Sequence, residues 1–383
     1  MNVSRDSGLY SEFIGELSDS YFVTVVAPRN NKMDTLGYAV EGGIGVIRIP
    51  EFFFLNKNPI LKAIKQLVSP LLFIFFITFY LKNEKFDWVV MPTPTITLSP
   101  VVKWIKKKYK CKFYLILRDI FPQNAVDMGF LKKESFIWRF YRYLESMTYE
   151  IADIIGCMSP ENINFLNINN DISPSKLKLL ENWTSCKNLR NKKINSYRKT
   201  FNVMFGGNLG VPQNVPFLIK VAEKIQNHKD IHFHIIGTGT EEEKIRKMIH
   251  SSRLCNISLS SRLSRNEYSK VLVNCDLGIV LLDEKFTVPN IPSRMLAYWA
   301  AGVPVLAATD INTDINENFI SKYNGGDWVK MNDYDAFIDK IMVFKNDPII
   351  CHELGLNGKN AVKENFLAEM AVKKFSTQIS IFN

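Results

Sequence analysis

Two glycine-rich segments follow strand-like apolar runs in the second half of the sequence. The segment GGNLG, Gly206–Gly210, leads into a helix-like stretch near Asn214, and GTGT, Gly237–Thr240, follows IHFHII. Glycine lets a backbone approach a diphosphate closely, and the N-terminus of a following helix supplies free N–H groups. Both turns would lie at the carboxyl ends of neighbouring parallel strands and face one crevice, although a tight turn without a ligand is the alternative. The candidate anion-binding residues are Gly206, Gly207, Asn208, Gly237 and Gly239.

A third segment, Phe286–Asp310, adds a cation to this half of the chain. Pro289 and Pro292 bracket a short rigid loop, and we expect Ser293 to cap the helix that follows. Arg294 would then lie in the first helical turn, where a cation is unfavourable unless an anion is bound nearby. The pattern predicts that Arg294 contacts the same anion as the glycine turns, with a solvated surface charge as the alternative.

The polar segments are held between apolar runs that alternate with helix-length stretches. Runs such as CKFYLILRD and CDLGIVLL are continuous, which is typical of parallel strands covered on both faces. The polar, basic stretch Thr184–Thr200 interrupts the alternation. We therefore predict an α/β fold with two Rossmann-like domains, 1–185 and 200–365, and a helix over 366–383 that could cross back to the first domain.

The start of the chain departs from this pattern. A doubly wound domain normally opens with a strand, whereas here LYSEFIGELSD is helix-like and almost directly follows Met1. We expect the first strand to be missing from an N-terminally shortened form; the alternative is a domain that simply begins with a helix.

Charge is divided unequally between the two halves of the chain. Residues 1–199 hold 28 Lys/Arg and 18 Asp/Glu, whereas residues 200–383 hold 20 of each. The apolar segment Leu67–Leu81 is too short to span a bilayer, and the lysine-rich Trp104–Lys112 lies further along the same domain. Together they favour peripheral contact with an anionic membrane surface, although a buried core helix and a solvated face are alternatives. No recognisable motif for nucleic acid is present.

Cysteine and histidine spacing gives no sign of a metal site. The six cysteines contain no CxxC pair, and none of the five histidines stands in an HExxH-like arrangement. We expect reduced cysteines and no metal or other cofactor.

Three segments together resemble a known family. The stretch IPSRMLAYWAAGVPVLA resembles the donor-site helix of family-4 glycosyltransferases of the bacterial capsule and O-antigen type, and GGNLG resembles their diphosphate loop. LRDIFPQNAVDMGFL, Leu117–Leu131, is similar to their acceptor-side segment. The resemblance implies a GT-B fold, a UDP-linked nucleotide-sugar donor, a polyprenyl-diphosphate-linked saccharide acceptor, and usually retention of anomeric configuration. It also implies a cytoplasmic location at the inner face of the cytoplasmic membrane.

Several family residues are replaced in this chain. Asn208 and Gln213 stand where many members carry an Arg and a Lys, and Pro289 and Ala297 stand where many carry a Glu-x7-Glu pair. If the chain is active, Lys285, Ser293, Arg294 and backbone amides are expected to bind the donor in their place.

Asp119 is the leading acceptor-side candidate. It ends the apolar run CKFYLILR, where loops of such folds carry chemistry, and the first domain contains no histidine. Asp119 could orient or deprotonate an acceptor hydroxyl, unless it pairs structurally with Arg118 or caps a turn. Two other functions remain open: a nucleotide-sugar epimerase of the same architecture, and a catalytically inactive scaffold.

Overall fold

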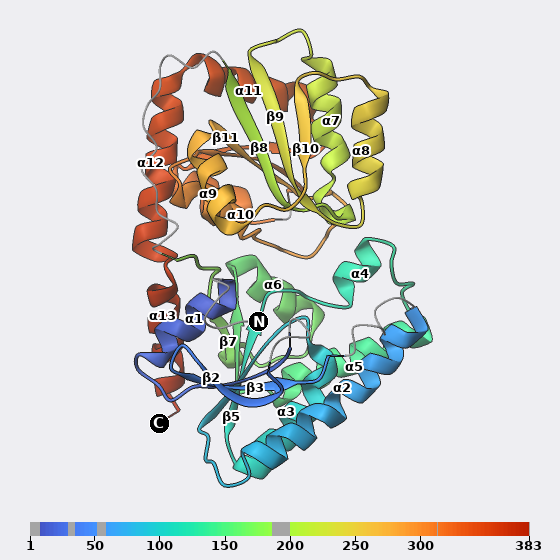
Figure 1. Cartoon of the computed structure of the whole chain (residues 1–383), viewed down its shortest axis with the longest axis vertical. Coiled ribbons are helices and arrows are strands. Elements are labelled where there is room, and N and C mark those ends of the chain that lie inside the picture. The colour runs from blue at the N-terminus through green and yellow to red at the C-terminus, as the bar shows by residue number, and fades with distance from the viewer. Residues whose placement is uncertain (1–7, 30–34, 52–58, 186–199, 312, 383) are drawn as a thin grey trace.

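The chain forms two α/β domains stacked along its long axis (Figure 1). The structure is a computed structural model that describes residues 8–29, 35–51, 59–185, 200–311 and 313–382. Most of the predicted linker, Thr184–Thr200, lies outside the described residues. Its two ends are described: Thr184 is bridged to Leu367, and Thr200 directly precedes the first strand of the second domain.

The first domain contains two separate sheets. The four-stranded sheet is parallel in the order β4-β5-β6-β7, and the three-stranded sheet has the order β1-β3-β2. The strands are β1 (Thr24–Pro28), β2 (Gly37–Glu41), β3 (Ile44–Ile49), β4 (Trp88–Pro92), β5 (Lys112–Leu117), β6 (Ile154–Cys157) and β7 (Leu177–Leu179). The helices are α1 (Leu9–Ser18), α2 (Pro59–Tyr80), α3 (Ser99–Tyr109), α4 (Gln123–Asp127), α5 (Phe136–Ile151) and α6 (Pro160–Asn169).

A hairpin that the sequence analysis missed completes the smaller sheet. β1 is parallel to β3, but β2 is antiparallel to β3 and joins it through Gly42 and Gly43. Both glycines have positive φ, 60° and 85°, as a two-residue hairpin turn requires. A glycine pair between two short apolar runs was the available signal for this hairpin.

Each sheet of the first domain has an edge strand whose outer side pairs with no other strand in the described part of the chain. There, β1 pairs only with β3, and β4 pairs only with β5. The first described element is α1, so no strand precedes it among these residues. Every residue of β1 is at least partly exposed, and Val90 of β4 is 37% exposed, although both strands are apolar.

The second domain is built on one six-stranded parallel sheet. Its order is β10-β9-β8-β11-β12-β13. The strands are β8 (Phe201–Asn208), β9 (Ile231–Thr238), β10 (Ile257–Ser260), β11 (Leu277–Leu281), β12 (Val305–Thr309) and β13 (Gly326–Lys330). The helices are α7 (Val215–Lys224), α8 (Glu242–Ser251), α9 (Arg265–Asn274), α10 (Arg294–Ala300), α11 (Tyr334–Asn346) and α12 (Pro348–Asn365). Apolar side chains cover both faces, which explains the continuous apolar runs of the central strands.

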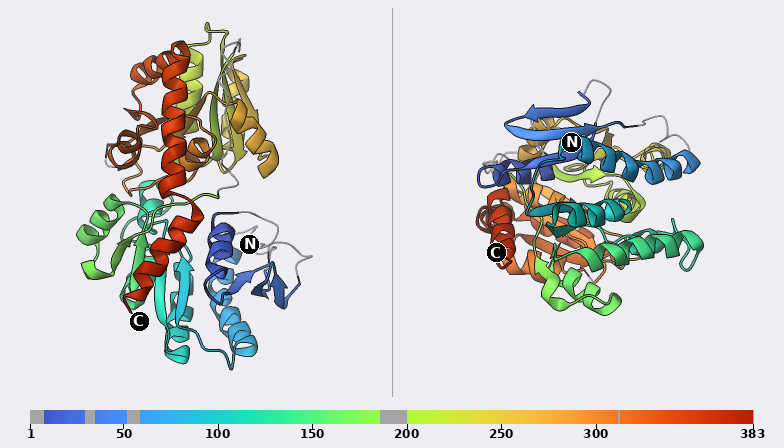
Figure 2. Two further views of the ribbon diagram at one scale, coloured as in Figure 1. Left: turned by 90° about the vertical axis from the view of Figure 1, so that its left-hand side faces the viewer. Right: turned by 90° about the horizontal axis from the view of Figure 1, so that it is seen from below.

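The last helix, α13 (Ala368–Ser380), belongs spatially to the first domain. Figure 2 shows α12 along the second domain and α13 continuing down the side of the first. Phe375 of α13 packs against Phe13 of α1 and Tyr114 of β5, with ring centroids 5.7 and 4.7 Å apart. Gln378 also accepts a 2.6 Å hydrogen bond from the Tyr114 hydroxyl. These contacts bring the two ends of the described chain together on one face of the four-stranded sheet of the first domain.

The anchoring of α13 can be tested through Phe375, which is 2% exposed. We expect Phe375→Ala to lower the free energy of unfolding by about 3–5 kcal/mol, because it removes a buried aromatic side chain and leaves a cavity. Ile381→Ala is the matched control, since Ile381 is 71% exposed and follows the same helix. Urea denaturation followed by fluorescence measures both variants, and equal losses would contradict the proposed anchor.

Candidate functional site

The two domains meet where strands of both sheets end. The Asp127 carboxylate, which follows β5, accepts 2.9 Å hydrogen bonds from the backbone N–H and the hydroxyl of Thr287. Asn162, which follows β6, donates from its side-chain amide to the carbonyl of Pro289 at 2.6 Å. Thr287 and Pro289 follow β11 of the second domain. The carboxyl ends of the two parallel sheets therefore face each other, which is where ligands bind in open α/β folds.

The loop of residues 283–292 makes most of this connection. Its Phe286 and Val288 are 6% and 2% exposed and pack within the apolar core of the first domain. Asn182 donates to the carbonyl of Ile291 at 2.6 Å. The loop is rigid not only through its two prolines but because its apolar side chains are buried across the domain boundary.

The buried Tyr298 fixes the first glycine turn, Gly206–Gly210, through hydrogen bonds. The Tyr298 hydroxyl accepts a 2.8 Å hydrogen bond from the Gly206 N–H and donates a 3.1 Å hydrogen bond to the Met204 carbonyl. The Gly206 N–H is therefore engaged by the protein, so Gly206 contributes position rather than a free donor. The hydroxyl of Tyr268 would clash with a Cβ at this position.

Arg294 lies directly beside Gly207. A Cβ added to Gly207, whose φ is +134°, would stand 3.2 Å from the Arg294 Cζ. The guanidinium stacks on the Phe205 ring with Cζ 4.5 Å from the ring centroid. Its Nη1 atom is buried without a hydrogen-bond partner in the described structure. Burial lowers the pKa of Arg294, while the nearby Tyr298 and Tyr268 oppose that shift.

The second glycine turn is packed onto the first. A Cβ on Gly237 would clash with the Gly207 carbonyl, and one on Gly239 would clash with the Leu209 backbone. Backbone bonds join the turns as well, because the Leu209 N–H donates to the Thr238 carbonyl at 2.9 Å. The structure thus brings both turns to one place, and close backbone packing already requires glycine at residues 237 and 239.

The structure also shows the surroundings of Ser293, Asn208 and Lys285, the other donor-side candidates. Ser293 occupies the residue before α10, but its backbone is helical and its side chain makes no capping hydrogen bond, so the predicted cap is wrong. Asn208 and Gln213 bond to each other, with Asn208 Nδ2 3.2 Å from Gln213 Oε1. The Lys285 side chain is exposed, and no hydrogen bond or ion pair links it to another described residue.

Asp119 lies just past the end of β5, on the first-domain side of the boundary. The hydroxyl oxygen of Thr93 accepts hydrogen bonds from the N–H groups of Arg118 and Asp119, at 2.8 and 2.9 Å. Arg118 makes no ion pair with Asp119, because its guanidinium donates to the carbonyls of Leu180 and Glu181. Burial raises the pKa of the Asp119 carboxyl, and the charge of Arg118 opposes this only in part. The pairing alternative for Asp119 is therefore not supported.

Sequence reasoning missed the aromatic side of this cluster. Trp183 lies under the Arg118 guanidinium, 4.7 Å from ring centroid to Cζ, and its ring meets Tyr10 edge-on with centroids 6.1 Å apart. Burial raises the pKa of the Tyr10 hydroxyl, and the charge of Asp119 adds to this rise. Tyr10 is the second residue of α1, so only the fold brings it to the end of β5.

Metal-binding geometry is absent from the described residues. Within those ranges, no three His, Cys, Asp or Glu side chains are grouped so as to hold a metal ion. Independence from metals stays a prediction.

Part of the chain matches a known protein family. Residues 187–361 match the family described as Glycosyl transferases group 1. The matched residues cover most of the second domain, which is therefore similar to a group 1 glycosyl transferase domain.

Relatives and solved structures agree with that match. The chain is 25% identical over 277 residues to Probable glycosyltransferase WbjE of Pseudomonas aeruginosa, covering 68% of this chain and 66% of that relative. It thus spans about two thirds of the relative's length. Anabaena HepE in complex with UDP and glucose superposes with a TM-score of 0.67 at 13% identity, covering 98% and 97% of the two chains. WaaG, a glycosyltransferase involved in lipopolysaccharide biosynthesis, gives 0.65 at 12% identity over 99% and 97%.

These comparisons confirm the coarser sequence predictions. The fold is GT-B, with two Rossmann-like domains and parallel sheets, and the family that residues 187–361 match is one of glycosyl transferases. The roles of individual site residues stay predictions.

The raised pKa of Asp119 predicts a pH-dependent stability in this GT-B fold. As pH rises past the ordinary Asp value, the unfolded chain ionises first while the folded carboxyl still holds its proton. Stability is therefore lost between the ordinary and the raised pKa, and Asp119→Asn should remove that loss. We expect the variant to gain stability over the wild type at pH 7 but not at pH 3, measured by thermal denaturation. Asp171→Asn, which changes an exposed carboxylate of the same domain, should show no such difference.

Proposed function

We propose that this chain transfers a sugar from a UDP-linked donor to a polyprenyl-diphosphate-linked saccharide in capsule or O-antigen synthesis, with retention of anomeric configuration. The observation that carries the donor half is the Arg294 guanidinium beside Gly207, with Nη1 buried and unpartnered. A guanidinium with a buried N–H group that lacks an acceptor is unfavourable, and a diphosphate would supply both the opposite charge and the missing acceptor.

The surroundings of Arg294 fit a nucleotide diphosphate. Gly207 has no side chain to separate its backbone from an incoming phosphate, and the Phe205 ring holds the guanidinium in place. Anabaena HepE, which shares the fold, binds UDP and glucose. That complex supports UDP as the donor nucleotide for this chain.

The proposed chemistry requires the enzyme mainly to stabilise a leaving group. The bond between the sugar's anomeric carbon and the UDP oxygen breaks, and a bond to the acceptor hydroxyl oxygen forms. Arg294 would neutralise the charge that builds up on the departing diphosphate, which is the largest contribution expected of such a site. The acceptor's proton passes to a base, and Asp119 is the candidate because its raised pKa brings it closer to neutral pH.

The acceptor half rests on the first domain. Residues 1–185 hold 22 Lys/Arg against 18 Asp/Glu, and α2 presents an exposed stripe of Leu71, Phe75 and Phe79. Within the described chain, no helix is at once long and apolar enough to span a bilayer. WaaG acts in lipopolysaccharide biosynthesis, which supports a surface-polysaccharide pathway for this chain. We accordingly place the enzyme at the cytoplasmic face of the inner membrane, bound peripherally to anionic lipid.

The donor site is tested by Arg294→Ala. We expect UDP binding to weaken by about 1.5–3 kcal/mol, the range for a charge-assisted hydrogen bond, measured by titration calorimetry. Arg262→Ala is the matched control, because Arg262 is an exposed arginine of the same domain. Unchanged UDP affinity in a folded Arg294→Ala protein would remove this residue from the donor site.

The acceptor-side role is tested by Asp119→Asn. We expect turnover, measured as UDP release from UDP-sugars in the presence of a lipid-linked saccharide, to fall by roughly 10²–10⁴-fold. UDP affinity should stay within twofold of the wild type, since Asp119 lies in the other domain. Near-normal turnover would exclude Asp119 from the reaction. A wild-type protein that binds UDP but releases none from any UDP-sugar would favour the inactive scaffold.

A further inference from the structure

The start of α5 exposes a cluster of large apolar side chains. Phe136 is 86% exposed, Ile137 57%, Phe140 40% and Tyr143 63%. Residues 136, 140 and 143 are spaced by four and three, so they form one stripe along the helix. The Ser135 hydroxyl accepts from the Trp138 N–H at 3.2 Å and fixes where the helix begins. The stripe is therefore a preformed surface of an ordered helix.

Cations surround this stripe. Lys132, Lys133 and Arg139 are exposed, whereas Glu134 is the one exposed acid between residues 130 and 143. Phe130, in the loop before α5, adds a further aromatic ring that is 66% exposed. We name Phe130, Lys132, Lys133, Phe136, Ile137, Arg139, Phe140 and Tyr143 the aromatic–basic surface. Aromatic rings flanked by cations are the composition that the interface of an anionic bilayer favours.

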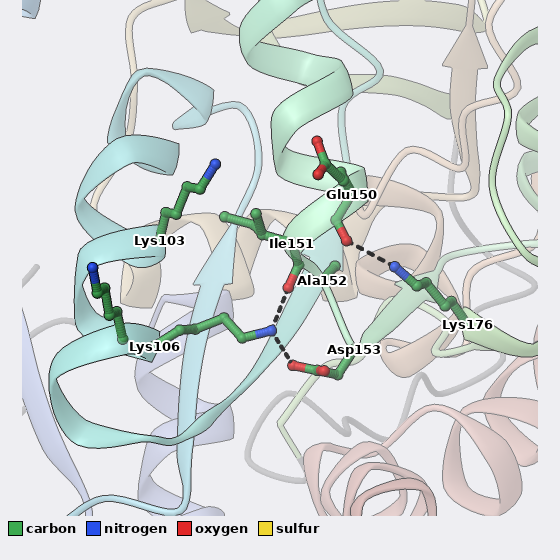
Figure 3. Close-up of a pocket in the computed structure, with 8 residues that line it drawn as sticks. Lys103, Lys106, Glu150, Ile151, Ala152, Asp153 and Lys176 are labelled. Atoms are coloured by element: carbon green, nitrogen blue, oxygen red, sulfur yellow. Dashed lines mark hydrogen bonds and ion pairs between the residues drawn. The ribbon is translucent and has the colours of Figure 1, made fainter.

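The lysine-rich segment Trp104–Lys112 is less suited to that role than its sequence indicates. Figure 3 shows the Lys106 ammonium bound to the Asp153 carboxylate and the Ile151 carbonyl, both at 2.6 Å. Lys176 donates to the Glu150 carbonyl at 2.8 Å across the same hollow. Both lysines satisfy groups at the C-terminal end of α5, where cations stabilise a helix. Lys108 lies over the ring of Trp104, 4.8 Å from its centroid.

The aromatic–basic surface is linked to the acceptor side of the crevice. Phe121, two residues after Asp119, packs edge-on against Tyr141 of α5 with centroids 4.8 Å apart. α4 follows on the chain, and its Asp127 makes the hydrogen bonds to Thr287 of the second domain. Figure 1 shows α4 and α5 on the same flank of the first domain, with α4 next to the domain boundary. A bilayer against α5 would thus lie beside the acceptor side of the site.

We propose that the aromatic–basic surface docks onto an anionic lipid bilayer and thereby presents the crevice to a lipid-linked acceptor. The inference rests on the proposed function for its acceptor, but membrane docking is measurable without turnover. A bilayer suits the surface better than a second copy of the chain, because the exposed cations would repel their own copies across a symmetric contact. Insertion of the rings adds a salt-resistant component, and the cations add a salt-sensitive one.

The test is co-sedimentation of the full chain with vesicles of phosphatidylcholine alone or mixed with phosphatidylglycerol. We expect binding only to the anionic vesicles, and a fall of about tenfold or more for Phe136→Ser/Ile137→Ser because the inserting apolar area is lost. Lys132→Gln/Lys133→Gln/Arg139→Gln should reduce anionic binding to a similar extent. Ile311→Ser/Ile349→Ser is the matched control, since these second-domain side chains are 73% and 77% exposed.

Other outcomes would overturn the proposal. Binding that survives the Phe136 variants but is lost in Phe75→Ser/Phe79→Ser or Lys107→Ser/Lys108→Ser would move the contact to α2 or α3. A dimer in analytical ultracentrifugation that dissociates in the Phe136 variant would assign the surface to a second copy. UDP calorimetry separates the two proposals: a protein that binds UDP but ignores anionic vesicles contradicts only the docking surface. A protein that binds vesicles but not UDP contradicts the proposed donor.

Discussion

The contact between Arg294 and Gly207 determines much of what surrounds it. Glycine is favoured at residue 207 because its φ is +134° and a Cβ there would stand only 3.2 Å from the guanidinium carbon. The buried Nη1 atom requires surroundings that tolerate a cation without neutralising it. The Phe205 ring and the hydroxyls of Tyr268 and Tyr298 provide that environment. None of them is an anion, so the charge is left for a ligand. A cation without an anion makes this site less stable than a core in which every polar group has a partner. This lower stability distinguishes a binding site from ordinary core packing.

The same tyrosine connects the site to the sheet. The Tyr298 hydroxyl bonds to the Gly206 N–H and to the Met204 carbonyl, so α10 and β8 cannot move independently. Both glycine turns then pack against each other through backbone alone, and any side chain at Gly237 would separate them. The rigidity of the donor side therefore comes from buried protein contacts, and a ligand needs to supply little ordering of its own.

Sequence reasoning predicted the parts of this molecule that depend on local pattern. Continuous apolar runs predicted the central strands, and the glycine turns and Arg294 were singled out before their contacts were known. It failed where a contact depends on distant residues. A local rule for helix starts predicted the cap at Ser293. The backbone there is instead set by the preceding loop, whose apolar side chains are buried in the first domain. Tyr10 carried no signal, since its position beside Trp183 depends on how α1 packs on the sheet.

The loop of residues 283–292 offers a structural reason why the Glu-x7-Glu pair is absent from this chain. The resemblance places the first of a Glu pair at Pro289, and here the Pro289 carbonyl accepts from Asn162 while Val288 is buried in the first domain. A carboxylate in this position would have to be desolvated against that apolar core, at a cost of several kcal/mol. The chain thus has an apolar, hydrogen-bonded domain contact where the resemblance would predict a carboxylate. Under the proposed function, the contact of Arg294 with the diphosphate then contributes more to donor binding than contacts to the sugar do.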